Sequence, residues 1–451
     1  MVENSSENNI AGRLERLPQS KFHLKFAMML ASGEWAESLM LLGNGAILGL
    51  VAATYGLKGN INAYYFPGFF FVGEFLGSIL FGRLADARGR KAVFLINQLL
   101  FGAGMIIAGF MNSWQLIGIF VLIGGIGVGG EFPLVDSYAT EIFPKQKRGA
   151  WLAVIYTVAV TSAPIIVYMT SLTAGMGYYS FRIPLWFMGI VGISVWLIRF
   201  KLMESPRWFE THGHLHEAKN LMDKIENEVK NETGMQDLPP IPNATSAVVQ
   251  NPGWLGMFAP DVSSTTILMA VFMFFQSGVF YGFVIFAPGL LNVKYPSSDP
   301  LGIAAVIFSG FFVGSVFNIF IMDKIERRTG IILFMVLGGV FGSMFAIASG
   351  LDESIIFGFL TSFMLWNFSN FYHQYNAEIF PTRLRTTAAG FVYSISRIST
   401  TLIVLFIAFY IGASNALGIF GFSWIMIGIC ALMLLLIGKV STGKQVEDIA
   451  N

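Results

Sequence analysis

Apolar runs long enough to cross a lipid bilayer recur along almost the whole of this 451-residue chain. A bilayer-spanning helix needs about 20 mostly apolar residues. Twelve stretches satisfy this requirement, and we expect spans at 26–52, 62–82, 92–111, 115–139, 150–173, 182–200, 264–290, 301–322, 331–350, 354–378, 386–411 and 415–438. The sequence therefore predicts an all-α polytopic membrane protein.

Composition excludes several other classes of protein. Only 12% of the residues are charged, whereas a soluble domain carries about 25%. The single cysteine, Cys430, excludes a disulfide scaffold, and a net charge of +1 argues against a nucleic-acid partner. The sequence contains no G-x-x-x-x-G-K-[ST] loop, no Cys/His metal-ligand spacing and no nucleophile–base constellation. We therefore expect no ATP-driven pump, no enzyme, and no metal or other cofactor.

Lysine and arginine fall mainly on one side of the predicted spans. Of the 28 basic residues, 24 lie in loops on the side of the N-terminus, and Lys58, Arg182 and Lys294 lie on the opposite side. Because basic loops stay in the cytoplasm, both termini are predicted to be cytoplasmic, in a protein of the plasma membrane. Arg199 is counted with the cytoplasmic loops, which leaves Arg397 as the one cation placed deep in a span.

A long polar stretch after the sixth span divides the chain into two halves. The expected organisation is a cytoplasmic tail at 1–25, a six-helix bundle at 26–202, a cytoplasmic linker at 203–258, a second six-helix bundle at 259–438 and a tail at 439–451.

Two charged signatures occur at matching places in both halves. An acid-then-base loop follows the second and eighth spans, and Glu-Ile-Phe-Pro followed by arginine ends the fourth and tenth spans. A carboxylate at a helix end can pair with an arginine of a neighbouring loop, and a repeat in matching halves is typical of duplicated transporters. We therefore expect a cytoplasmic gate formed by Gly82, Asp86, Arg90, Glu141, Arg148, Asp323, Arg327, Glu378 and Arg385.

The pattern G-x-L-x-D-x-x-G-R-K at 82–91 resembles the loop signature of the major facilitator superfamily. The resemblance implies two six-helix bundles, a central substrate site, and rocking between inward-open and outward-open states. Segments 138–141 and 204–209 resemble the sugar porters, whereas segments 129–134 and 381–385 resemble proton-coupled phosphate and organic-ion symporters.

Ionisable groups inside a span are costly and usually functional. Glu34 and Glu37 lie three residues apart and share one helix face, so they cannot both ionise cheaply and one should carry a proton. Glu131 and Asp136 point about 140° apart on the fourth span, so at most one should face a central cavity. These four carboxyls are the predicted proton-coupling residues, and the resemblance to phosphate symporters favours Glu131.

Arginine in a span needs an acidic partner or an anionic ligand, because its guanidinium stays protonated. Its forked donors fit a carboxylate or phosphate. The tenth span adds a stripe of amide and imidazole groups, and the seventh adds a glutamine and a tyrosine. The predicted substrate-binding residues are Arg397, Gln276, Tyr281, Asn367, Asn370 and His373. The many phenylalanines are expected to face lipid or pack helices rather than to form an aromatic cage.

The residues together predict a secondary transporter for a small polar metabolite. The favoured hypothesis is proton-coupled symport of a small organic anion, driven by the proton gradient, by a monomer without a protein partner. A sugar or polyol porter, with or without protons, stays open as an alternative. A transporter-like nutrient sensor is a remote one, because the predicted tails are short.

Overall fold

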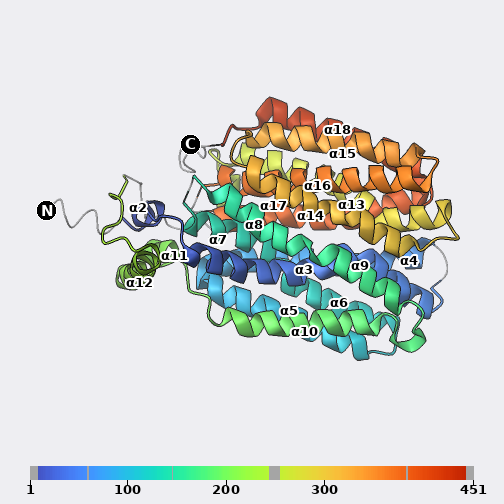
Figure 1. Cartoon of the computed structure of the whole chain (residues 1–451), viewed down its shortest axis with the longest axis horizontal. Helices are drawn as coiled ribbons and strands as arrows, with labels where there is room; N and C mark the ends of the chain where they lie inside the picture. Colours follow the sequence, from blue (N-terminus) through green and yellow to red (C-terminus); the bar gives the residue numbers. More distant parts are fainter. Residues whose placement is uncertain (1–8, 58–59, 145, 243–253, 382–383, 443–451) are drawn as a thin grey trace.

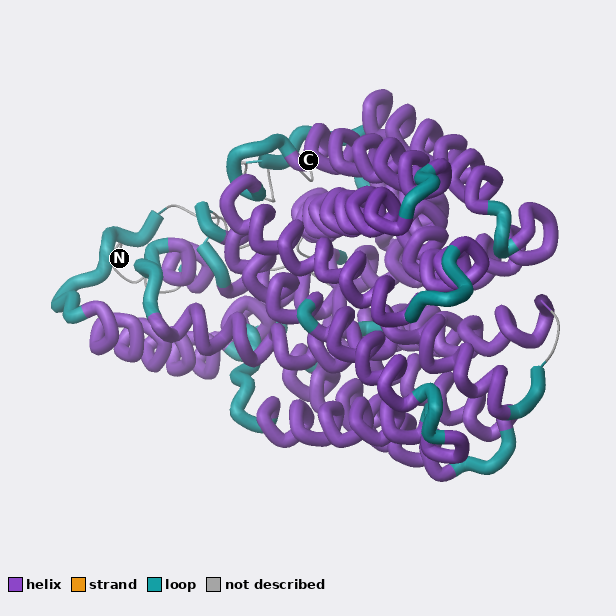
Figure 2. Tube along the Cα trace, turned by 45° about the vertical axis from the view of Figure 1, so that its right-hand side comes forward, coloured by secondary structure: helices purple, strands orange, loops and turns teal. Residues whose placement is uncertain are grey.

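The structure is a computed structural model, which describes residues 9–57, 60–144, 146–242, 254–381 and 384–442; the side chains of 60–67, 254, 385 and 386 lie outside the described part. All its regular elements within these residues are helical. The helices run side by side along the long axis of the molecule, with the first half of the chain below and the second half above in Figure 1. Figure 2 shows the same bundle from a second direction, with most loops at its two ends.

The first half contains six bilayer-length segments, two of which are interrupted. Its elements are α3 (Lys21–Thr54), α4 (Asn60–Arg88), α5 (Arg90–Phe110), α6 (Trp114–Val128), α7 (Glu131–Ile142), α8 (Arg148–Val160), α9 (Ser162–Thr173), η1 (Gly177–Tyr179) and α10 (Arg182–Arg199). The first helix begins at Lys21, five residues before the predicted span.

The second half repeats this arrangement. Its elements are α13 (Ser263–Lys294), α14 (Pro300–Ile321), α15 (Arg327–Ile347), α16 (Leu351–Ile379), α17 (Arg385–Phe406), the π-helix η3 (Ile407–Gly412) and α18 (Ala416–Ile437). The halves meet where α4 packs along α17 and where α14 packs along α8 and α9. The prediction of a twelve-helix, two-bundle membrane protein is confirmed.

Apolar side chains cover the outside of the bundle as well as its core. Large apolar residues are more than half exposed on many of the helices, among them Leu80, Phe110, Ile190, Leu197, Phe320 and Leu436. A surface of this kind is stable in lipid, where every backbone polar group is satisfied within its own helix.

Eleven of the described helical segments are long and apolar enough to span a bilayer by composition alone. The twelfth, α16, is 29 residues long but carries a run of amide, imidazole and carboxyl groups in its second half. These polar side chains are buried inside the bundle, which is why a helix of lower hydropathy can take a central position.

Two predicted spans contain a break. Gly129 and Gly130 separate α6 from α7, and Thr161 separates α8 from α9. At Gly129 the neighbouring helix is so close that a β-carbon would lie 2.2 Å from the backbone oxygen of Glu74. Ser78 of α4 donates a hydrogen bond to the Gly129 carbonyl, which satisfies a group that the break leaves free.

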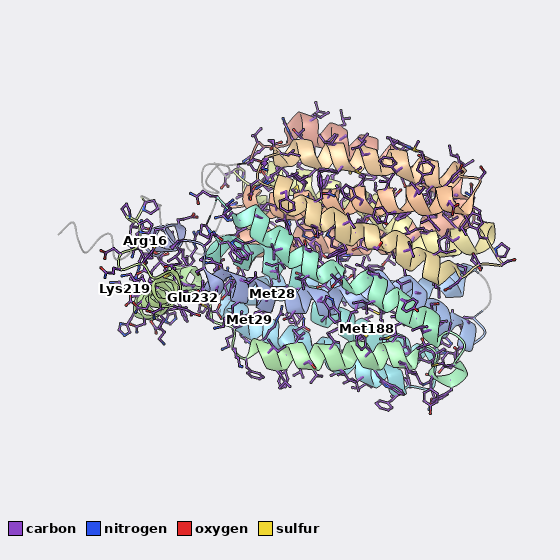
Figure 3. All side chains as sticks on the ribbon, in the orientation of Figure 1. Arg16, Met28, Met29, Met188, Lys219 and Glu232 are labelled. Atoms are coloured by element: carbon purple, nitrogen blue, oxygen red, sulfur yellow. The ribbon has the colours of Figure 1, made fainter. Side chains whose placement is uncertain are left out.

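Four further elements, α2 (Ile10–Glu15), α11 (Pro206–Thr211), α12 (Leu215–Thr233) and η2 (Trp254–Phe258), complete the fold. The first three project from one end of the bundle, which we call the linker end (Figure 1). Arg13 of α2 lies 2.8 Å from Glu226 and 2.5 Å from Asp223 of α12, and Arg16 lies 2.7 Å from Glu226. Figure 3 labels Arg16 and Glu232 within this group. The segment before the first membrane helix is therefore docked on the linker.

Candidate substrate cavity

A small cavity lies between the two halves, with room for about one water molecule. Its lining comes from α3, α7 and α8 of the first half and from α13, α16 and α17 of the second half. The lining residues are Leu41, Phe132, Tyr156, Phe280, Tyr281, Trp366, Ser369, Asn370, Tyr372, His373, Tyr393 and Arg397. Eight of these twelve residues carry an aromatic ring or an imidazole. Aromatic side chains therefore form much more of this site than the sequence indicated.

Arg397 is the cation of the cavity and is only 1% exposed. Its guanidinium donates hydrogen bonds to the phenol oxygens of Tyr281 and Tyr393. Its Nε lies 3.6 Å from Oε2 of Glu74, on α4 of the other half. Among the described residues, the acidic partner that the sequence analysis requires of a buried arginine is therefore Glu74.

Asp136 links the two halves beside the cavity. Its Oδ2 lies 2.8 Å from Nδ1 of His373, on α16, and its Oδ1 accepts a hydrogen bond from the hydroxyl of Tyr156. The His373 ring is stacked on Phe132 at 4.9 Å and on Tyr372 at 4.4 Å between centroids. His373 thus contacts both halves through a hydrogen bond and through ring stacking.

Glu131 points away from the cavity, as the predicted angle to Asp136 requires. It forms a two-point ion pair with Arg199 at the end of α10, and both side chains are fully buried. A β-carbon on Gly33 would lie 1.9 Å from the Arg199 guanidinium, so only glycine leaves room for this pair. The prediction that Arg397 is the one cation deep in a span is therefore wrong. Arg199, which was counted with the cytoplasmic loops, is also buried at the end of a span. The apolar run that precedes Arg199 was the available signal.

Glu34 and Glu37 are fully buried in the middle of α3. The carboxyl oxygens of Glu34 have no hydrogen-bond partner among the described residues, and the carboxyl of Glu37 lies beside that of Glu74. The charged neighbours of Glu34 are Glu131, Asp136, Arg199 and Arg397, whereas Glu37 lies near Glu34 and Glu74. The predicted pair of carboxyls therefore lies next to both buried arginines without being bonded to either.

The structure brings four of the six predicted substrate-binding residues to the cavity, namely Tyr281, Asn370, His373 and Arg397. Asn367 instead accepts a hydrogen bond from Asn318 of α14 at 2.9 Å, within the second half. Gln276 is buried with its amide nitrogen 3.5 Å from the sulfur of Met273, and it does not line the cavity.

The repeated signatures form matching networks at the linker end. In the first half, Arg90 lies 2.8 Å from Glu141 and 3.3 Å from Asp86. In the second half, Arg327 lies 3.0 Å from Asp323 and 3.4 Å from Glu378. In each network, an arginine of the loop pairs with a carboxylate at the end of a helix. In both halves this is the helix end that the sequence predicted to supply the carboxylate.

Glu204, which follows α10, binds the first-half network to the linker. Its carboxylate accepts hydrogen bonds from the backbone N–H groups of Arg90 and Lys91. Burial raises the pKa of this carboxyl above its ordinary value, although the hydrogen bonds from the backbone of Ser205 and Arg90 act in the opposite direction.

Three contacts join the networks of the two halves. Asp86 accepts hydrogen bonds from the backbone and the hydroxyl of Thr387, at 3.0 and 2.6 Å. Asp323 accepts one from the backbone N–H of Ala150 at 3.1 Å. A β-carbon on Gly390 would lie 3.4 Å from the α-carbon of Gly82, so α4 and α17 are in close contact here. The linker end of the bundle is closed in this structure.

Arg148 has a partner that the sequence did not indicate. Its guanidinium lies 3.3 Å from Glu15 of α2, which also lies 3.6 Å from Arg207 of α11. The segment before the first membrane helix therefore contacts a predicted gate residue. The side chain of Arg385, the remaining predicted gate residue, lies outside the described residues.

The fold defines the class of protein first. The solved structure of the proton:xylose symporter XylE of E. coli, a major facilitator superfamily protein bound to 6-bromo-6-deoxy-D-glucose, superposes with a TM-score of 0.73 at 17% identity. The match covers 95% of this chain and 98% of that one. The chain has the major facilitator fold of two six-helix bundles.

The family follows from the sequence comparison. A family model described as "Sugar (and other) transporter" matches residues 46–445, and the chain belongs to this family. The inner membrane metabolite transport protein YdjE of Escherichia coli (strain K12) is 24% identical, with 98% of each chain covered. The niacin transporter NiaP of Acinetobacter baylyi is 20% identical, with 98% of this chain and 99% of that one covered. The protein is thus an integral membrane transporter of the sugar and metabolite class, and not an enzyme.

Proposed function

We propose that the protein is a secondary transporter that moves a small organic anion together with a proton by alternating access. The proposal rests on one observation. Arg397 lies in the cavity, and two buried carboxyls near it, Glu34 and Glu37, have no counter-ion of their own within the described part of the chain. The gradient of protons is the proposed driving force, with no cofactor. The proposed functional unit is a monomer.

The donors around the cavity favour an anion. Arg397 donates to the oxygens of Tyr281 and Tyr393, so each phenol O–H remains able to donate a hydrogen bond elsewhere. A guanidinium and two phenol hydroxyls can therefore converge on the oxygens of one carboxylate. Charge-assisted hydrogen bonds of this kind are short and strong in a buried site.

The balance of buried charge favours a bound proton. The described middle of the bundle contains five carboxyls, at Glu34, Glu37, Glu74, Glu131 and Asp136, which are at most 1% exposed. Two guanidinium groups pair with Glu131 and Glu74, and Asp136 is hydrogen-bonded to Tyr156 and His373, whereas Glu34 and Glu37 have no such ion pair among the described residues. Leaving an unpaired charge buried costs several kcal/mol, so Glu34 and Glu37 are the groups that carry protons in this state.

Proton release can then be coupled to substrate release through Arg397. Ionised Glu34 or Glu37 and a substrate carboxylate would compete for the same guanidinium, which both acids adjoin. Protonation of the acid removes this competitor, so that the guanidinium, which remains beside Glu74, can bind the substrate. We place the linker end in the cytoplasm because the basic loops lie there. Opening of this end would expose both the bound substrate and the protonated acid to water.

A sugar porter is the second candidate function. Membership of the sugar (and other) transporter family supports it, as does the fold shared with a xylose symporter. Similar proteins are named as a niacin transporter and as a D-xylose transporter, so both kinds of substrate are included in the test.

Uptake by the full chain in proteoliposomes tests the proposal. Labelled monocarboxylates, phosphate and hexoses are compared with and without an inward acid gradient, with protein-free vesicles as background because neutral acids cross bilayers unaided. We expect gradient-driven accumulation of a monocarboxylate and its loss in Arg397→Ala. Lys201→Ala, which removes an exposed cation at the linker end, is the matched control. Hexose uptake that is indifferent to pH would overturn the proposal.

A further inference from the structure

We propose that the transported anion is a flat aromatic carboxylate, whose ring stacks between the two halves while its carboxylate binds Arg397. This inference rests on the proposed function and names the substrate class of the same cavity. It comes from the way in which aromatic rings meet across the interface between the halves.

Ring contacts join the halves at the cavity. Phe132 of the first half is stacked on His373 at 4.9 Å and lies 5.7 Å from the ring of Tyr393, both in the second half. Tyr156 of the first half lies 5.1 Å from His373. Outside the cavity lining, Phe71 of the first half also meets Tyr281 at 5.3 Å. Each of these pairs must separate when one half rocks away from the other.

An aromatic ligand can take the place of these contacts. Two aromatic rings whose centroids lie about 4.5–7 Å apart stabilise each other by more than the burial of their contact area alone. As the halves separate, the faces of Phe132 and His373 become free on opposite sides of the cavity. A flat ring inserted between them restores a stacked contact on each of its faces, whereas a puckered ring cannot lie flat against both.

Several polar groups of the cavity already have hydrogen-bond partners within the protein. The hydroxyl of Tyr156 and Nδ1 of His373 bond Asp136, and Asn370 lies 3.4 Å from the hydroxyl of Ser315. A sugar with four or five hydroxyls needs a partner for each of them, and some of these partners would have to give up an existing hydrogen bond, which is costly. An aromatic acid needs polar partners at its carboxylate alone.

The position of Arg397 fits a carboxylate at the edge of such a ring. Its guanidinium carbon lies 4.2 Å from the ring centroid of Tyr393 and 5.3 Å from that of Tyr281. Tyr393 is also a ring neighbour of Phe132 and His373. Tyr393 therefore lies between the cation and the stacked pair as a neighbour of both, which suits a ligand that has a carboxylate attached to an aromatic ring.

Binding to the full chain in detergent at one fixed pH tests the inference. The probes are benzoate, cyclohexanecarboxylate, benzyl alcohol and xylose, which vary the ring and the carboxylate separately. Quenching of tryptophan fluorescence is the readout, since Trp366 lines the cavity, and Trp366→Phe identifies its signal. We expect benzoate to bind about tenfold more tightly than cyclohexanecarboxylate, because two ring faces are stacked.

Variants sharpen the assignment. Phe132→Leu should reduce the preference for benzoate over cyclohexanecarboxylate to about threefold, since one of two faces is lost. Phe334→Leu is the matched control, because Phe334 stacks on Phe371 at 5.6 Å and does not line the cavity. A variant that fails to fold is recognised by its elution profile, and the wild-type comparison of the two acids then decides by itself.

The outcomes separate the two proposals. Equal binding of benzoate and cyclohexanecarboxylate overturns the aromatic inference and leaves the proposed anion symport intact. Binding of xylose with neither acid overturns both. Benzyl alcohol binding as tightly as benzoate overturns the role of Arg397 as the anion site.

Discussion

Nδ1 of His373 lies 2.8 Å from Oδ2 of Asp136, and this contact joins α16 of the second half to α7 of the first half in the middle of the protein. Both side chains are buried, at 3% and 1% exposure. In the proposed alternating-access cycle the halves rock apart at this level, so the contact would break and form again in each cycle.

The first prediction is a coupling between these two residues in transport. Asp136→Asn and His373→Phe should each slow turnover, and the double variant should be no slower than the worse single one. Hydrogen bonds to charged groups contribute about 1.5–3 kcal/mol, so a double-mutant cycle on uptake rates should give a coupling of that size. Asn318→Ala with Asn367→Ala, a pair within the second half, is the control, for which no coupling in turnover is expected. Additive losses at Asp136 and His373 would contradict the prediction.

The second prediction concerns Glu34 and Glu37. Replacing either by glutamine keeps its shape but removes the titrating group, so accumulation against a gradient should fall at least tenfold while exchange of labelled for unlabelled substrate continues. Both reactions are measured in the same proteoliposomes. Glu217→Gln, at an acid that is about half exposed, should change neither. Normal accumulation in both membrane variants would remove these acids from the proton pathway.

The third prediction concerns the closed linker end. Asp86→Asn loses the charge that accepts two hydrogen bonds from Thr387 and pairs with Arg90. Turnover should fall several-fold, whereas the dissociation constant of the substrate should change less than twofold, because Asp86 does not line the cavity. Asp352→Asn, an exposed acid in the first turn of α16, is the control. An unchanged turnover would mean that this contact does not contribute to gating.

The fourth prediction is a pH dependence at the docked N-terminal helix. Burial acts to raise the pKa of Glu226, but the hydrogen bonds and charges of Arg13 and Arg16 outweigh it, so the pKa lies below its ordinary value of 4.5. A lowered folded-state pKa means that docking is stabilised at neutral pH and weakens as the pH falls below about 4.5. Protection of the segment around α2 from an acid-active protease should therefore decrease between pH 6 and pH 3.5.

Arg13→Ala provides the matching variant at neutral pH. It removes a guanidinium that contacts both Glu226 and Asp223, so the segment should be cleaved about tenfold faster at pH 7 than in the wild type. Its cleavage should also depend less on pH. Equal protection of variant and wild type would show that apolar packing alone holds α2 on the linker.

Much of the architecture could be predicted because it depends on local composition. A run of apolar residues spans a bilayer wherever it occurs, and the repeated loop signatures place Arg90 beside Glu141 and Arg327 beside Glu378 in each half. The angle between Glu131 and Asp136 also follows from helix geometry alone. Their partners did not follow, since Arg199 and His373 come from other helices.

The sequence alone was enough to establish the number of helices and their division into two halves, and it placed Glu34, Glu37 and Arg397 in the membrane, although it misplaced Arg199. Tertiary structure decided which of them meet: Glu74 with Arg397, Arg199 with Glu131, and aromatic rings around a cavity that was expected to be polar. The physical reason is that periodicity defines the faces of one helix, whereas the tilt and rotation that bring two faces together are set by packing against neighbouring helices.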